Sequence, residues 1–188
     1  MLQGYYLMPE DNDSVMFENK DYNQCPKCGL KIGSDINLEL ILGINKYDFS
    51  TTYDGYIIVS NNFKEFCEIE KLLNLAFTPL VLYKDFWLFD TKNILEFDTM
   101  KRKTQLINLC TECYQYREVI GANPVTLKQS YEIKEGIHKT DIIFGSNNSK
   151  SPLLIAGIET TKKMKEMKFS GIFYKEVLYM EKLMPVKK

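Results

Sequence analysis

The chain has 188 residues, of which 45% are hydrophobic and 26% are charged. This length and composition are typical of one globular domain, which we predict to span residues 1–188, and no apolar run is long enough to cross a membrane. The net charge of −1 disfavours proteins that bind nucleic acid through a large positive charge. Because the first residues lack a signal peptide, we expect a cytoplasmic protein.

The charges are distributed unevenly along the chain. Residues 1–100 contain 8 Lys and Arg against 16 Asp and Glu, whereas residues 101–188 contain 16 against 9. If each half forms one face, this difference predicts an acidic surface for a basic partner. Alternatively, the two halves interleave in space and their charges mix.

The first half of the chain predicts an opening strand and a strand-helix-strand unit. Residues 2–8 favour a strand that ends in a polar turn, and residues 15–17 a brief return strand. The unit covers residues 54–83: a β-branched run suits a buried strand, Ser60 to Asn62 can cap a helix, and an apolar stripe follows.

The second half predicts further strands and another unit of the same kind. Strands are expected at 86–89 and 94–97, which would pair, and at 106–109, 125–133 and 142–144. The second strand-helix-strand unit covers residues 151–180, with Thr160 or Thr161 as helix cap. Aligning Ser60 with Gly157 indicates a diverged internal duplication, although any two such units look alike. The predicted fold class is α+β (mixed α/β), with more strand than helix.

Four of the five cysteines occur in two Cys-x-x-Cys pairs, within segments 22–33 and 106–116. They are Cys25, Cys28, Cys110 and Cys113. Two such pairs brought together supply the four sulfur ligands of a tetrahedral zinc site. Since four cysteines leave no open position for water or substrate, we predict a structural zinc held by two zinc knuckles.

The residue after each pair bears on how the knuckle closes. Gly29 follows the first pair and permits the positive φ that completes the curl, whereas Tyr114 follows the second, so we expect that knuckle to close differently or less tightly. Three alternatives to zinc are a thioredoxin-like redox pair, disulfides, and unconnected buried thiols. Cys67 lies in an apolar helical pattern and is expected to pack as a small hydrophobe.

No pattern of catalytic residues is present, so we predict that the chain is not an enzyme. His138 is the single histidine and has no nucleophile in a recognisable motif beside it, so we expect a polar residue in a turn. There is no glycine-rich phosphate loop, and the carboxylates are scattered. The basic cluster at residues 101–103 and the lysines at residues 162–168 keep nucleic-acid binding open as an alternative.

The chain resembles the double-CxxCG-motif immunity proteins of bacterial polymorphic toxin systems. The resemblance rests on the two cysteine pairs, the strand and helix that begin at Ile57, and residues 77–79 and 170–177. The second pair departs from the family pattern because Tyr114 replaces the glycine.

The resemblance implies a cytoplasmic protein that binds and neutralises a cognate toxin protein. Such a protein needs a rigid scaffold and a complementary surface, and no chemistry of its own. An acidic first half would suit a basic toxin such as a nuclease, and Glu65, Glu68 and Glu70 are the residues proposed to contribute to binding. A zinc-knuckle nucleic-acid-binding or regulatory protein is the alternative.

Overall fold

A computed structural model describes residues 1–17, 22–33 and 35–179. The strands are β1 (Leu2–Asp11), β2 (Phe49–Thr51), β3 (Ile57–Ser60), β4 (Leu75–Leu80), β5 (Tyr83–Thr91), β6 (Ile94–Leu95), β7 (Gln105–Leu109), β8 (Tyr116–Ile120), β9 (Ile137–Ser146), β10 (Ser149–Ala156) and β11 (Ile172–Leu178). The helices of this part of the chain are α1 (Asn61–Ile69), α2 (Thr99–Arg102) and α3 (Ile158–Met167). The prediction of a mixed, strand-rich fold is therefore confirmed.

The strands form one mixed sheet in the order β4-β5-β3-β2-β1-β10-β9-β8-β7, with β11 beside β1 and β6 beside β9. Most neighbours are antiparallel, but β2 runs parallel to β1 and β6 parallel to β9. Strand β1 continues beyond the predicted turn at Pro9, because this segment pairs with β11 and then with β2. Strand β1 therefore joins the β4-β5-β3-β2 half of the sheet to the β10-β9-β8-β7 half.

Three strand predictions differ from the structure. Residues 15–17 form no strand, because Met16 is fully buried in a small core between the N-terminal segment and β3 and β5. Residues 94–97 do not pair with β5, since β6 pairs with β9 instead. Residues 125–133 form no strand beyond one isolated bridge at Leu127, because their apolar side chains fill a core under β9 and β10.

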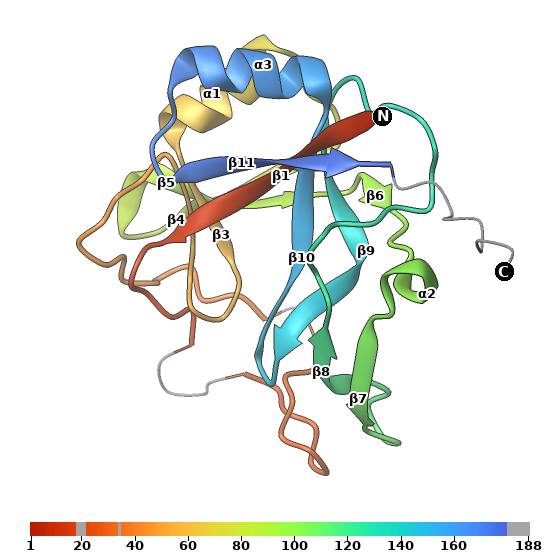
Figure 1. The fold of residues 1–188 in the computed structure, drawn as a ribbon. Helices are drawn as coiled ribbons and strands as arrows, with labels where there is room; N and C mark the ends of the chain where they lie inside the picture. Colours follow the sequence, from red (N-terminus) through yellow and green to blue (C-terminus); the bar gives the residue numbers. More distant parts are fainter. Residues whose placement is uncertain (18–21, 34, 180–188) are drawn as a thin grey trace, which may run out of the picture.

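Helices α1 and α3 lie next to each other at one end of the molecule, and the cysteine-bearing loops lie at the opposite end (Figure 1). Phe63, Phe66 and Cys67 of α1 are buried against the sheet, and so is Met164 of α3. Burial of these apolar side chains on one face of each helix is what fixes the helices on the sheet. Within the described residues, no helix combines the length and apolar character that crossing a bilayer requires.

The helix starts agree only in part with the predictions. Ser60 is the N-cap of α1, and its hydroxyl accepts the N–H of Phe63 at 3.3 Å. The N-cap of α3 is Gly157, whereas Thr160 and Thr161 are buried inside the helix, so they do not cap it. A Cβ on Gly157 would lie 2.5 Å from the N atom of Glu135, so only glycine fits this close approach of two backbones.

The two predicted strand-helix-strand segments do not pair their own strands. Strand β5 lies between β3 and β4, and strand β1 lies between β10 and β11. Residue 180, at the end of the second segment, lies outside the described residues. The internal duplication stays a prediction.

The acidic and basic halves of the sequence interleave at several places. Three ion pairs within the described residues join a carboxylate from residues 1–100 to a lysine from residues 101–188. They are Glu96 with Lys128, Asp90 with Lys139, and Glu70 with Lys163. At these places the charges of the two halves mix, so residues 1–100 as a whole do not form one acidic face, and any acidic surface is confined to a smaller region.

Asp48 links α1 to the loop that follows α3. Its carboxylate accepts hydrogen bonds from the Ser60 hydroxyl at 2.7 Å, and from the Ser170 N–H at 3.0 Å and hydroxyl at 2.8 Å. Burial raises the pKa of Asp48, but these hydrogen bonds outweigh burial and lower the pKa below its usual value. The charged carboxylate therefore stabilises the folded state.

The Asp48→Asn substitution should lower the free energy of unfolding by about 1–2 kcal/mol at pH 7, since hydrogen bonds to a partly exposed charged group are lost. Because the folded pKa is depressed, the wild-type contribution is present above about pH 4 and disappears as the pH falls through the folded value. Urea unfolding between pH 2.5 and 7 measures this. The variant should lose less stability than the wild type toward low pH, while the exposed control Asp85→Asn should follow the wild type.

Candidate metal centre

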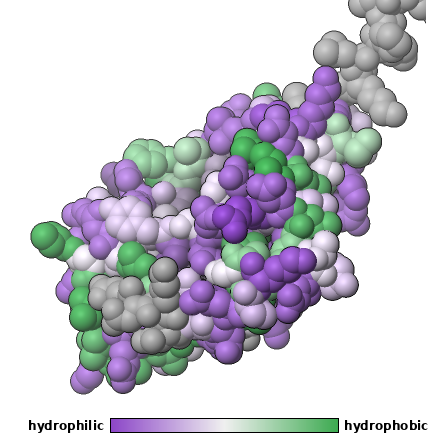
Figure 2. Space-filling model, turned by 90° about the horizontal axis from the view of Figure 1, so that it is seen from below, coloured by the Kyte–Doolittle hydropathy of each residue, from purple (hydrophilic) through white to green (hydrophobic). Residues whose placement is uncertain are grey.

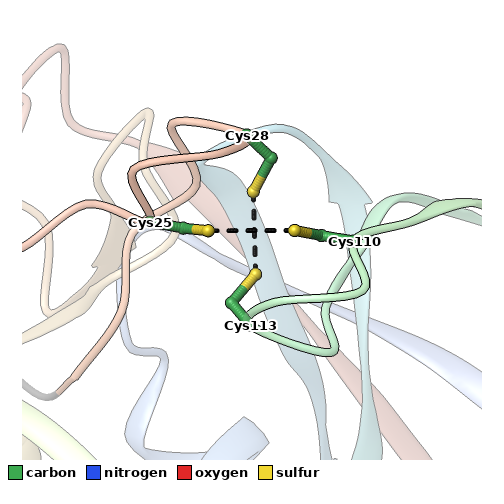
Figure 3. A group of neighbouring side chains, drawn as sticks. All are labelled: Cys25, Cys28, Cys110 and Cys113. Carbon is green, nitrogen blue, oxygen red and sulfur yellow. Dashed lines mark hydrogen bonds between the residues drawn. The ribbon is translucent and has the colours of Figure 1, made fainter.

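The structure brings together all four cysteines of the two pairs. Cys25 and Cys28 come from the N-terminal loop, and Cys110 and Cys113 from the turn between β7 and β8, and their four Sγ atoms point toward one centre (Figure 3). All four Sγ atoms lie within 4.8 Å of one another. Two contacts join the loops: Sγ of Cys25 to Sγ of Cys110 at 3.8 Å, and Sγ of Cys28 to Sγ of Cys113 at 3.6 Å.

These distances fit a tetrahedral metal site. With Zn–S bonds of about 2.3 Å, the edges of a regular sulfur tetrahedron are about 3.8 Å long. A disulfide needs an S–S distance of about 2.0 Å, so none of these contacts is a disulfide, and the cysteines are free. The four residues can therefore hold one metal ion, and their softness and number suit zinc or another thiophilic ion.

Both knuckles close in the same way. Gly29 has a φ of +72° and donates its N–H to the Cys25 carbonyl at 2.8 Å, and Tyr114 has a φ of +56° and donates to the Cys110 carbonyl at 2.9 Å. The prediction that the second knuckle closes differently is therefore wrong. The left-handed backbone of Tyr114 has a local steric cost, because its Cβ lies close to the following carbonyl oxygen, and the hydrogen bond to Cys110 offsets part of that cost.

The thiols of the cluster ionise unequally. The backbone N–H groups of Cys113 and Glu112 stabilise the thiolate of Cys110 and lower its pKa to about 6. The Leu30 N–H also lowers the pKa of Cys28, but burial and the other three cysteines outweigh it and raise the pKa to about 12. One thiolate therefore forms readily near neutral pH, whereas four close thiolates need a cation to compensate their charge.

A shell of hydrogen bonds holds the first knuckle on the sheet. Lys31, just after the first pair, donates its N–H to Oδ1 of Asn148 at 2.8 Å and accepts at its carbonyl from Nε2 of Gln115 at 2.9 Å. Arg117 of β8 donates from Nη2 to the Cys28 carbonyl at 3.2 Å. The β9–β10 turn and β8 thus position the first knuckle, a contribution that has no local signal in the sequence.

The remaining candidate residues lie away from this cluster. Cys67 is buried in α1 among phenylalanine rings, as predicted, and burial raises the pKa of its thiol to about 12. His138 lies in β9 and not in a turn, where its Nε2 is 3.1 Å from the Glu135 carbonyl oxygen. Neither contributes a ligand to the four-cysteine cluster.

The Gly29→Ala substitution should weaken metal binding about tenfold, because a Cβ in the left-handed region costs about 1–2 kcal/mol. The new Cβ would meet only Oε1 of Gln24, at 4.0 Å, so the cost comes from the backbone and not from a clash. Competition with a fluorescent zinc chelator measures the affinity. Tyr114→Ala is the control, since it keeps a Cβ on a left-handed residue and should change nothing; equal losses in both variants would contradict the prediction.

Comparison with known proteins finds neither a family model nor a curated protein that matches the chain. The class that the fold and the site define is thus a strand-rich α+β protein with a four-cysteine cluster suited to a metal ion.

Proposed function

We propose that the chain is an immunity protein of a bacterial polymorphic toxin system, which binds and neutralises a cognate toxin in the cytoplasm. The observation that carries the proposal is the convergence of the two Cys-x-x-Cys pairs, the motif on which the resemblance to the double-CxxCG immunity proteins rests. The proposed occupant of the cluster is one structural zinc ion. It would join the N-terminal loop to the β7–β8 turn across a loop of 82 positions.

A binding role is favoured over a catalytic one by the nature of the cluster. Four thiolate ligands saturate a tetrahedral ion, so a zinc ion held by all four has no position for substrate. The metal therefore stabilises a surface and takes no part in a reaction. We also propose that residues 54–83 and 151–180 are diverged copies, supported by the N-caps Ser60 and Gly157 at equivalent positions.

Three of the lysines that kept nucleic-acid binding open, Lys101, Lys163 and Lys165, engage other parts of the chain. Lys163 pairs with Glu70, and Nζ of Lys165 lies 4.3 Å from the ring centre of Tyr5. Nζ of Lys101 lies 4.8 Å from the ring centre of Tyr179. Because these contacts compete with phosphate for the same cations, they support the choice of a protein partner.

The test is co-expression with the toxin domain encoded beside the gene of this chain. Cells that express the toxin alone should stop growing, and cells that also express this chain should grow, with the two proteins purifying together as a stoichiometric complex. A toxin from an unrelated system is the control and should still kill. If the chain rescues no growth, or if it purifies with nucleic acid that salt removes, the proposed function is wrong.

A further inference from the structure

A groove of about 420 Å³ runs between α1 and α3, at the end of the molecule opposite the cysteine cluster (Figure 1). Phe66 and Phe169 are buried and form its floor. Ile69 and Met167 line it from the two helices and are 76% and 54% exposed. Large apolar side chains with this exposure at a groove are typical of a docking site for a partner.

The groove is acidic at its rim. It is lined by four carboxylates, those of Asp48, Glu65, Glu70 and Glu166, and by a single lysine, Lys163. Asp48 is engaged by Ser60 and Ser170, and Glu70 by Lys163. Glu65 accepts a hydrogen bond from Nδ2 of Asn61 in its own helix, which leaves its charge uncompensated. Glu65 and Glu166 are exposed, one on each helix, so their negative charges face whatever enters the groove.

We propose that this groove docks a segment of a partner protein in which a large apolar side chain is flanked by Lys or Arg. The apolar side chain would enter between Ile69 and Met167, and its basic neighbours would meet Glu65 and Glu166. The inference rests on the proposed function, in which this partner is the toxin. It places the acidic surface at two carboxylates, one from each half of the sequence.

The described residues also line a larger cavity, of about 490 Å³, toward the cysteine-bearing end of the molecule, but its charges are balanced, since three lysines and three aspartates line it. Figure 2 looks at that end and shows apolar residues in separate groups between polar ones. The floor of the groove is packed on the aromatic core. Phe66 and Phe169 form this floor, and both contact the buried ring of Phe63. A rigid floor loses little entropy when a partner binds.

Glu68 provides a matched control for the charge of the rim. It lies on the same helix as Glu65 but outside the groove lining, and it forms an ion pair with Lys64 at 2.6 Å. Reversal of Glu68 therefore changes the net charge of α1 without changing the groove. Among the three glutamates that the sequence singled out, the structure places Glu65 and Glu70 at the groove and Glu68 away from it.

The test measures binding of the co-encoded toxin to the full chain by calorimetry at low salt. The double variant Glu65→Lys/Glu166→Lys should raise the Kd about tenfold or more, and this effect should shrink in 0.5 M salt. The control double variant Glu68→Lys/Glu166→Lys should lose only about half as much binding free energy as the first variant loses. Ile69→Ser/Met167→Ser should weaken binding at both salt concentrations. If the toxin binds the wild type and all variants equally, the groove is not the docking site, although the immunity function stands.

A synthetic probe tests the groove without the toxin. The probe is a helical peptide with Leu on one face and Lys on the others, titrated into the isotope-labelled chain and followed by amide NMR shifts. The inference is supported if the shifts are confined to α1, α3 and the loop after α3 and if they disappear in the Ile69→Ser/Met167→Ser variant. Shifts elsewhere, or none, overturn it. Failure of the toxin to bind together with a positive peptide result would reject the proposed function and retain the groove.

Discussion

Replacement of one ligand, as in Cys110→Ser, should lower the free energy of unfolding by about 4 kcal/mol or more when zinc is present in excess, because zinc binding to the folded state adds its linkage energy to stability. The whole stability of a domain is about 5–15 kcal/mol, so the loss should be visible as a large fall in the midpoint of urea unfolding. The wild type should contain one zinc per chain by elemental analysis, and the variant should contain less.

The control for the cysteine cluster is Cys67→Ala. Cys67 is also buried but lies in α1, so this variant should retain one zinc per chain and lose only the packing of a small side chain. Removal of zinc with a chelator should lower the free energy of unfolding of the wild type to about that of the Cys110→Ser variant. The same treatment should hardly change the free energy of unfolding of Cys110→Ser itself. If Cys110→Ser and Cys67→Ala retain the same metal and the same stability, the cluster is not a metal site.

The Phe63→Ala substitution should destabilise the chain by about 3–5 kcal/mol, the usual cost of a large cavity in a packed core. Phe63 is 0% exposed, and its ring centre lies 5.1 Å from that of Phe49, 5.3 Å from Phe169 and 5.8 Å from Phe89. The ring thus joins α1 to the sheet and to the segment after α3. Urea unfolding followed by circular dichroism measures the loss.

Phe173→Ala is the control for the core substitution. Phe173 lies on β11 and is 58% exposed, so its removal should change the free energy of unfolding by less than about 1 kcal/mol. The slope of unfolding with urea should stay the same in both variants, since the surface exposed on unfolding is nearly constant. A small effect of Phe63→Ala would mean that α1 is not anchored through this ring.

The four-cysteine cluster and the groove lie at opposite ends of the fold, and β1 connects the two halves of the sheet (Figure 1). Removing the metal should therefore release the knuckle segments first, because their hydrogen bonds to β8 and to the β9–β10 turn are few. Helices α1 and α3 have the phenylalanine core beneath them and should open last.

The sequence by itself determined the features that depend on local chemistry. The Cys-x-x-Cys spacing identified Cys25, Cys28, Cys110 and Cys113 as a set, since thiolates at this spacing serve one ion. The hydroxyl of Ser60 before an apolar stripe located the start of α1, because the cap bonds within its own turn. Thr160 and Thr161 misled the same reasoning, since both are buried inside α3 and the Thr160 hydroxyl accepts the N–H of distant Gly136.

Only the tertiary structure decided which strands pair and where the surfaces lie. The placement of β5 between β3 and β4, and of β1 between β10 and β11, depends on long-range burial that no window of sequence contains. Tyr114 adopts a left-handed backbone although it is not glycine, which its residue type did not indicate. The acidic groove exists because two helices far apart in sequence lie on one face of the sheet, so side chains of opposite halves come together there.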